Sequence, residues 1–194
     1  GGGYIKVPGN AVTNVIEHIT FASTGGGTDF GDLTDARRVV ASASSPTRTV
    51  FQGGVGSTGT SNIRDIIDYV TTASTGDAQD FGDLVSAKRD HSGGSSAVRA
   101  LSAGSTGNSN AIDYITIAST GNSTDFGDLT VGRSSTGAGS NSVTLAVYGG
   151  TSPGADVTID KVTISTTGNA TDFGDAARGG EKPGAASSGH GGVN

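Results

Sequence analysis

The stretch that decides the fold is Ile67-Asp68-Tyr69-Val70-Thr71-Thr72, followed by Thr75-Gly76 and then by Asp80-Phe81-Gly82-Asp83. The tetrapeptide Asp-Phe-Gly-Asp occurs in four places, each time with Thr-Gly five residues before it. The four copies are Asp29–Asp32, Asp80–Asp83, Asp125–Asp128 and Asp172–Asp175. This recurrence shows that the chain consists of four degenerate copies of one repeat of about 47 residues, and such a period predicts a repeat architecture.

Two segments of each copy have the pattern of β-strands. Upstream of Thr-Gly, apolar and polar residues alternate and β-branched side chains dominate, which is typical of a half-buried strand. These segments are 16–21, 67–72, 112–117 and 159–164. A second apolar segment ends at a glycine pair in two copies, at 49–52 and 145–148, and a weaker one at 100–102 precedes Ala103-Gly104. Paired glycines at a strand end predict a turn or a close backbone approach.

Each copy is therefore interpreted as strand, turn, strand, variable loop, strand, turn and short strand. Four strands in about 47 residues make one propeller blade, and no copy shows a helical pattern. The predicted fold is all-β: one domain, 1–194, forming a small β-propeller of four four-stranded blades closed by pairing of the N- and C-terminal strands. The blades are placed at 1–35 completed by 176–194, at 36–84, at 85–129 and at 130–175.

Two other arrangements stay open, because residues 179–194 contain few β-branched residues and would make weak strands. In the first, this chain is an excerpt of a longer array. Because it starts with Gly rather than Met, it is expected to be a processed product or a piece of something longer. Alternatively, several chains complete one another's sheets.

Composition excludes several function classes. The net charge is −6 at pH 7, whereas binding to nucleic acid needs a basic face. The absence of cysteine removes disulfides and thiolate metal sites. No apolar run approaches the length of a membrane span, so membrane insertion is not expected. No cofactor is predicted.

The repeat resembles the Kelch repeat, in which an Arg and small residues precede an apolar strand, a glycine pair and an Ile-Asp-Tyr strand. Phe30, Phe81, Phe126 and Phe173 stand about where that family has Trp. Segments 115–130 and 45–48 look like repeats of marine bacteriophage virion proteins of the tail-fibre or appendage kind. This resemblance implies an extracellular virus particle as the location. It implies other virion proteins or further copies of this chain as partners, and host attachment as a role.

Candidate site residues are few. Tyr69 and Tyr114 share one repeat position with His18 and Lys161, which predicts a solvent-facing position where a tyrosine could stack on a host-surface glycan. The paired acids of Asp-x-x-Asp could bind Ca²⁺, but a turn in which Asp caps backbone amides is favoured. Neither catalytic nor metal-ligating residues are predicted.

Recurring acid–base pairs are a further candidate feature of the repeat. They are Asp32/Arg37, Asp83/Arg89, Asp128/Arg133 and Asp175/Arg178. Such pairs could bind an anionic or sugar ligand around a central channel. Salt bridges between blades are the favoured interpretation.

The sequence thus predicts a non-enzymatic structural and binding module that displays variable loops, chiefly 54–62, 104–110 and 150–157. The alternative is a purely architectural subunit of a fibre, sheath or capsid decoration. A glycan-processing enzyme is disfavoured, because the copies differ by losing residues rather than by gaining a catalytic constellation.

Overall fold

The computed structural model describes residues 1–5, 11–56, 59–140, 144–148 and 156–180. In these residues all regular structure is β, and every named strand pair is antiparallel. The first half contains β1 (Gly3–Ile5), β2 (Ala11–Thr13), β3 (Val15–His18), β4 (Thr28–Asp32), β5 (Ala41–Ser44), β6 (Arg48–Gln52), β7 (Ile66–Thr71) and β8 (Gln79–Asp83). The second half contains β9 (Ser92–Ser95), β10 (Arg99–Ser105), β11 (Ser109–Thr116), β12 (Thr124–Asp128), β13 (Gly137–Ser140), β14 (Thr144–Tyr148), β15 (Thr158–Thr163) and β16 (Thr171–Asp175).

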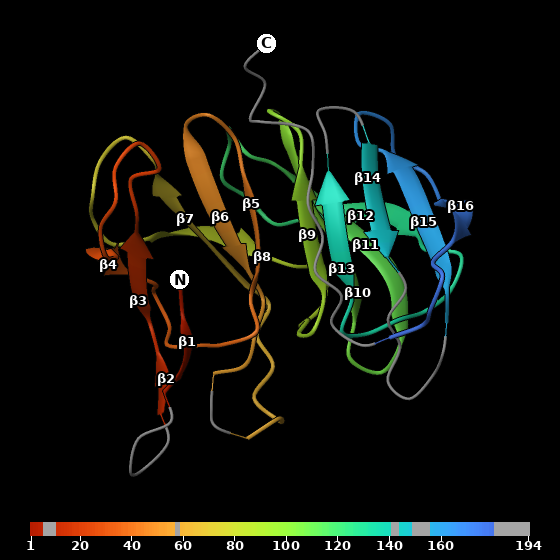
Figure 1. Ribbon diagram of the computed structural model, residues 1–194, viewed down its shortest axis with the longest axis horizontal. Coiled ribbons are helices and arrows are strands. Elements are labelled where there is room, and N and C mark those ends of the chain that lie inside the picture. Colours follow the sequence, from red (N-terminus) through yellow and green to blue (C-terminus); the bar gives the residue numbers. More distant parts are fainter. Residues whose placement is uncertain (6–10, 57–58, 141–143, 149–155, 181–194) are drawn as a thin grey trace.

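Three sheets have four strands each, in the order β5-β6-β7-β8, β9-β10-β11-β12 and β13-β14-β15-β16. We name them blades 2, 3 and 4. Blade 1 consists of two pairs, β1 with β2 and β3 with β4. The blades follow one another across the molecule, from β4 at the left edge of Figure 1 to β16 at the right edge. This arrangement of meandering sheets is propeller-like, and none of the sheets is closed on itself.

The strands predicted from alternation are confirmed. The Ile-Asp segments form β3, β7, β11 and β15, and the segments before the glycine pairs form β6, β10 and β14. Gly2 also behaves as the first glycine of a pair. Its N–H donates to Val15 O at 3.0 Å, as Gly53 N–H donates to Ile66 O at 2.9 Å. Blade 1 therefore begins at the glycine pair and holds no counterpart of β5 and β6 in the described residues.

The favoured turn at Asp-Phe-Gly-Asp is wrong. All four tetrapeptides lie in the last strand of their blade, β4, β8, β12 and β16, as the short fourth strand of the pattern predicted. The pairing register shifts opposite the glycine in each blade, for example between Ile67 and Asp68 on the partner strand of β8. A bulge at this glycine lets the outer strand hold two acids beside a buried phenylalanine.

The innermost strands are built from small residues. β5, β9 and β13 read Ala-Ser-Ala-Ser, Ser-Gly-Gly-Ser and Gly-Ala-Gly-Ser, and β5 packs against β9, which packs against β13. Ser95 Oγ donates to Ser44 O at 2.8 Å, and a Cβ on Gly93 would collide with the backbone of Ser42. Small side chains thus allow the first strands of successive blades to approach closely.

The core lies between blades. One buried cluster combines Phe126 and Leu129 of blade 3 with Val162, Ile164 and Ala170 of blade 4. A second combines Phe81 and Leu84 of blade 2 with strand β11 and the turn after it, and a third joins blades 1 and 2. Each blade is therefore stabilised chiefly by its neighbour, as expected for a repeat protein.

The glycine of the tetrapeptide allows neighbouring blades to touch. Gly82 has φ +141°, and a Cβ there would lie 2.5 Å from Gly121 O of the next blade. Gly174, the same position of the last blade, has φ +139°, but no described residue lies within 4 Å of where its Cβ would stand.

We expect Gly82→Ala to destabilise the protein more than Gly174→Ala, by at least about 1 kcal/mol in the free energy of unfolding. Both alanines suffer the same positive-φ strain, of about 1–3 kcal/mol, but only the one at position 82 also meets a neighbouring backbone. Urea denaturation of both variants measures the difference. Equal losses would show that the contact between blades does not depend on this glycine.

Candidate functional site

Buried ion pairs join each blade to the next. Arg37, after β4, contacts Asp68 of β7 at 2.8 Å, and both side chains are fully buried. Arg133, after β12, contacts Asp160 of β15 at 2.8 Å in the same way, and Lys88 contacts Asp113 of β11 at 3.1 Å. The favoured interpretation, salt bridges between blades, gave the wrong partners. The acid comes from the Ile-Asp strand of the following blade, and in blade 2 the base is Lys88 rather than Arg89.

In two of these pairs a threonine also donates hydrogen bonds to the carboxylate. Thr34 donates to both carboxylate oxygens of Asp68, from Oγ1 at 2.6 Å and from its backbone N at 3.1 Å. Thr130 does the same for Asp160. Arg37 also donates to Phe51 O at 3.3 Å. The carboxylates are thus satisfied by a guanidinium, a hydroxyl and a backbone amide, which a buried charge requires.

The middle pair lacks this threonine, because Val85 stands at its position. Asp113 Oδ2 makes no hydrogen bond of good geometry, although Lys88 Nζ lies 3.1 Å away. Burial raises the pKa of Asp113, with the Lys88 charge opposing the shift. Burial likewise lowers the pKa of Lys88, against the attraction of Asp113.

We expect Val85→Thr to stabilise the protein by about 0.5–1.5 kcal/mol, because the new hydroxyl can donate to Asp113 as Thr34 Oγ1 donates to Asp68. The side chain of Val85 is exposed, so the change costs little apolar burial. Thermal and urea denaturation test this expectation. Val98→Thr, at an exposed valine away from any ion pair, is the matched control and should leave stability within about 0.5 kcal/mol.

His91 is buried beside this middle pair. Among the described residues, neither ring nitrogen makes a hydrogen bond of good geometry. Burial, with the nearby Lys88 charge, lowers its pKa from 6.5 to about 3, and the backbone of Gln52 opposes this shift. The imidazole stays neutral in the folded protein, whereas in the unfolded chain it takes up a proton as the pH drops below 6.5. Acid therefore favours the unfolded chain, and the free energy of unfolding falls below pH 6.5.

Between pH 6.5 and pH 5 this histidine should cost about 2 kcal/mol of stability, at about 1.4 kcal/mol for each pH unit. We therefore expect His91→Gln to remove that part of the acid sensitivity. Urea denaturation of both proteins at pH 7 and pH 5 measures it. Asp113, whose raised pKa acts in the opposite direction, is present in both proteins and cancels in the comparison. Identical pH dependence would contradict the assignment.

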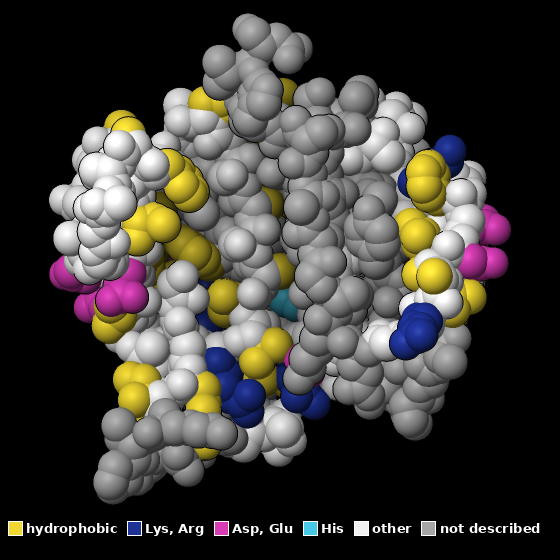
Figure 2. Space-filling model, viewed as in Figure 1, with side chains coloured by type: hydrophobic (Ala, Val, Ile, Leu, Met, Phe, Trp, Pro, Cys, Tyr) yellow, Lys and Arg dark blue, Asp and Glu magenta, His cyan; other side chains and the backbone are white. Residues whose placement is uncertain are grey.

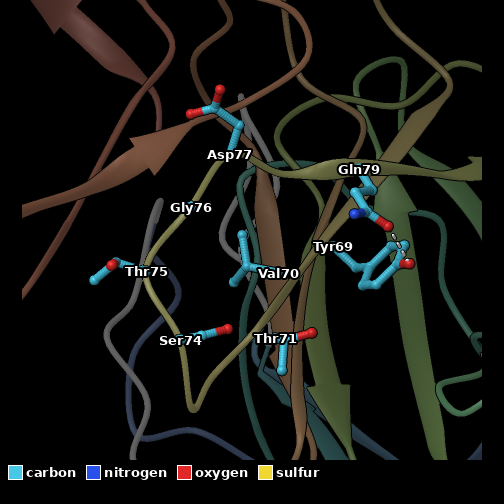
Figure 3. Close-up of a pocket in the computed structure, with 8 residues that line it drawn as sticks. All are labelled: Tyr69, Val70, Thr71, Ser74, Thr75, Gly76, Asp77 and Gln79. Carbon is cyan, nitrogen blue, oxygen red and sulfur yellow. Dashed lines mark hydrogen bonds between the residues drawn. The ribbon is translucent and has the colours of Figure 1, made fainter.

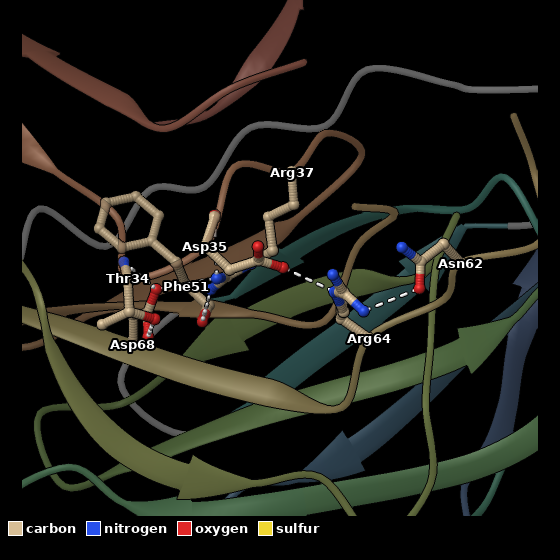
Figure 4. A network of polar contacts seen from close by, with 7 residues as sticks. All are labelled: Thr34, Asp35, Arg37, Phe51, Asn62, Arg64 and Asp68. Carbon is tan, nitrogen blue, oxygen red and sulfur yellow. Dashed lines mark hydrogen bonds and ion pairs between the residues drawn. The ribbon is translucent and has the colours of Figure 1, made fainter. Parts of the chain in front are cut away.

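The loops after the glycine pairs are anchored at the same end of the blades. Arg64 donates from Nε to Asp35 Oδ2 at 2.6 Å and from Nη1 to Asn62 Oδ1 at 2.7 Å, as Figure 4 shows. Arg38 Nη2 donates to Gly59 O at 3.0 Å, and Arg89 Nη2 donates to Thr106 Oγ1 at 3.1 Å. We call the surface formed by residues 34–38, 59–64, 88–90 and 104–108 the loop face. Lys and Arg side chains gather at the lower centre of Figure 2, where these loops lie.

The loop face combines guanidinium groups, an amide and exposed backbone in loops of unequal length. The first predicted display loop, 54–62, contributes residues 59–62 to it, and the second, 104–110, contributes residues 104–108; residues 57–58 lie outside the described part of the chain. The third, 150–157, lies outside the described residues except for Asp156 and Val157. Arg64 and Arg38 were not among the sequence-predicted residues, and their only signal was their position beside the glycine-rich loops. Arg89 was predicted only as the partner of Asp83.

The structure places Tyr69 on β7 and Tyr114 on β11, where the two rings pack against different core clusters. Each ring is half-buried and lies edge-to-face on the phenylalanine of its own tetrapeptide, with centroids 5.8 Å apart. Arg48 covers the Tyr69 ring at 4.4 Å from its centroid, and Arg99 covers Tyr114 at 4.6 Å. His18 and Lys161 also contact the phenylalanine of their own blades. What Tyr, His and Lys share at this position is therefore a contact with an aromatic ring.

A pocket of about 170 Å³ adjoins Tyr69. Figure 3 shows Tyr69 and Gln79 joined by a hydrogen bond of 2.7 Å, with Ser74 and Asp77 on the connecting turn. Ligand pockets are usually about 300–1,000 Å³, so this hollow is small. Asp77 itself accepts a hydrogen bond from Asp32 N at 3.0 Å, which ties the turn to blade 1.

In the part of the chain that the structure describes, no three His, Asp or Glu side chains gather as metal ligands would. The same residues contain no helix that is long and apolar enough to cross a bilayer.

The geometry defines the class: an all-β, propeller-like repeat protein whose blades are joined by buried ion pairs. No protein-family model matches the chain, and no curated protein matches it. Among solved structures it is similar to the structure of YjhT, with a TM-score of 0.74 and 9% sequence identity. The match covers 95% of this chain and 69% of that chain. A likeness at this identity shows the fold alone.

Proposed function

We propose that this chain is a non-enzymatic structural and binding module of a bacteriophage particle, in which a propeller-like scaffold presents the loop face to a host-surface glycan. Other virion proteins or copies of the chain are its neighbours on the particle. The observation that carries the proposal is the anchoring of a variable loop by Arg64, which contacts Asp35 and Asn62 at once. A rigid scaffold that fixes otherwise variable loops is the usual arrangement of a recognition surface.

The chemistry of the loop face fits a sugar ligand. Guanidinium groups, an amide and backbone carbonyls offer hydrogen bonds to hydroxyl and carboxylate groups of a glycan. Tyr69 and Tyr114 remain a second candidate location, with the pocket beside Tyr69 as the place where a sugar ring would enter. The two locations lie on different parts of the blades and can be separated by mutation.

The test is binding of the purified chain to an array of bacterial surface glycans. We expect Asn62→Ala and Arg64→Ala to reduce binding at least tenfold, and Tyr69→Ala to leave it unchanged. The reverse pattern would move the site to the tyrosine pocket. If no glycan binds while the chain assembles into larger particles, the architectural alternative, a subunit of a fibre, sheath or capsid decoration, replaces the proposal.

We also propose that the four blades close into a ring. In it, residues 176–194 supply the strands that blade 1 lacks. Residues 181–194 lie outside the described part of the chain. What supports the ring is the match of Gly2 to the first glycine of a later copy, which leaves blade 1 two strands short. Those strands can come from the same chain or from another one.

A further inference from the structure

The contact between blades is built in the same way three times. The outer strand of one blade accepts hydrogen bonds from the Thr-Gly turn of the next. Gly121 N donates to Phe81 O at 2.7 Å, and Ser123 N donates to Asp83 O at 2.7 Å. Equivalent pairs of bonds join β4 to the turn at Gly76 and β12 to the turn at Gly168. Every such contact has an acceptor half on one blade and a donor half on the next.

One acceptor half is left open on blade 4. Among the described residues, no backbone N–H donates to the carbonyls of Phe173 or Asp175. The side chain of Phe173 is 63% exposed, whereas Phe81 and Phe126, at the same position, are 2% exposed. In the described part of the chain, nothing lies within 4 Å of where a Cβ on Gly174 would stand, whereas a Cβ on Gly82 would touch the next blade. Blade 4 therefore presents the surface that blades 2 and 3 bury.

One donor half is left open on blade 1. Within the described part of the chain, Gly25 N and Gly27 N make no bond to another blade. Ile19 is 57% exposed and Phe21 is 96% exposed. The residues at the position of Ile19 in the other copies are buried; they are Val70, Ile115 and Val162.

The two open halves fit each other in volume and charge. Buried leucines follow the tetrapeptide in the first three copies, but Ala176 follows it in blade 4. Phe21 is in turn larger than Ile117 and Ile164, which share clusters with those leucines at its position. Arg178 is the base that follows the tetrapeptide of blade 4, three residues after Asp175, whereas the bases of the buried ion pairs lie five residues after theirs. Glu17 stands where the later blades have the acid. Both side chains are exposed.

In one chain these halves lie on opposite sides of the molecule. Figure 1 places β3 and β4 at the left and β16 at the right, and Figure 2 shows hydrophobic side chains on both flanks. We propose that blade 4 of one chain packs against blade 1 of a second copy, through the contact that the chain makes three times within itself. The same contact made in both directions closes a ring of two chains. This proposal does not depend on the ligand of the loop face.

The first test is the mass in solution by light scattering and sedimentation. We expect the wild-type chain to show twice the 18.9 kDa of one chain. Phe173→Asp and Phe21→Asp should each reduce the mass to that of one chain, because each places a charge in the contact. Val98→Asp, at an exposed valine in the β9–β10 turn, is the matched control and should keep the doubled mass.

Mixing the two variants tests the direction of the contact. A Phe173→Asp chain keeps an intact blade 1, and a Phe21→Asp chain keeps an intact blade 4. The mixture should therefore form a pair through one remaining contact, although neither variant pairs alone. A wild-type mass of one chain at all concentrations would overturn the proposal and favour closure within one chain. A doubled mass that both variants retain would overturn it too, since another surface would then join the chains.

Charge reversal keeps the test valid if the aspartate variants do not fold, which circular dichroism would show. Glu17→Arg and Arg178→Glu should each weaken pairing at least tenfold, and the double variant should restore it. Failure of the double variant to restore pairing would contradict the pairing of these two charges across the contact. Glycan binding that persists in unpaired variants would separate this proposal from the proposed function.

Discussion

Replacing Asp68 by Ala is expected to lower the free energy of unfolding by about 3–5 kcal/mol, because it leaves the Arg37 guanidinium buried without its counter-charge. Arg37 is fully buried, and Asp68 is also the acceptor for two hydrogen bonds from Thr34. A loss of this size is a large part of the stability of a single domain. Urea denaturation followed by far-UV circular dichroism measures it.

Asp35→Ala is the matched control in the same polar network. Its partner Arg64 lies 2.6 Å away, but both side chains are about 30% exposed, so water can replace the lost contact. Exposed pairs contribute about 0–1 kcal/mol, and the control should lose no more than that. Replacing the whole buried pair, as Arg37→Met with Asp68→Leu, should recover much of the loss. Equal costs for Asp68→Ala and Asp35→Ala would show that burial does not set the energy of the pair.

Phe81→Ala should destabilise the protein by about 3–5 kcal/mol, because it opens a cavity between blades 2 and 3. Phe81 is 2% exposed and shares a cluster with Leu84, Ile115 and Ile117. The cavity would fall at the contact that holds the two blades together. Differential scanning calorimetry should therefore show a lower melting temperature and a smaller unfolding enthalpy.

Phe173→Ala makes the same chemical change at the same repeat position, where the side chain is 63% exposed. Its cost should be within about 0.5 kcal/mol when measured at a concentration where the mass is that of one chain. At higher concentration the same substitution should weaken pairing between chains. A large loss in the single chain would mean that Phe173 is covered by residues of its own chain.

Much of the fold could be predicted from the sequence, since the pattern that defines a half-buried strand is local. Alternation in segments such as Ile67–Thr72 predicted β7 and its counterparts, and the glycine pair predicted the close approach at Gly53, whose φ is +60°. The Asp-Phe-Gly-Asp segment was predicted as a turn, because Asp and Gly are rare in strands. Its strand conformation depends on a bulge and on the backbone of the next blade, which no local pattern contains.

The polar contacts were harder to predict, because they join residues of different copies. The nearest acid in sequence to Arg37 is Asp35, whereas its partner in the fold is Asp68, from the following blade. A signal was present: an acid is the second residue of the Ile strand in every copy, and a base follows the tetrapeptide in every copy. Two recurring opposite charges without a local role indicate a contact between repeats.

The joints between blades have a consequence for how such a chain can change over generations. The hydrogen bonds at Gly76, Gly121 and Gly168 come from the backbone, and they lie at fixed distances along each copy from the strands they join. All the difference in length among the copies falls between the glycine pair and the next Ile strand. Insertions there leave every joint in register. The repeat can therefore diversify through its loops, which can be lengthened, shortened or exchanged while the strands and the contacts between blades are inherited unchanged.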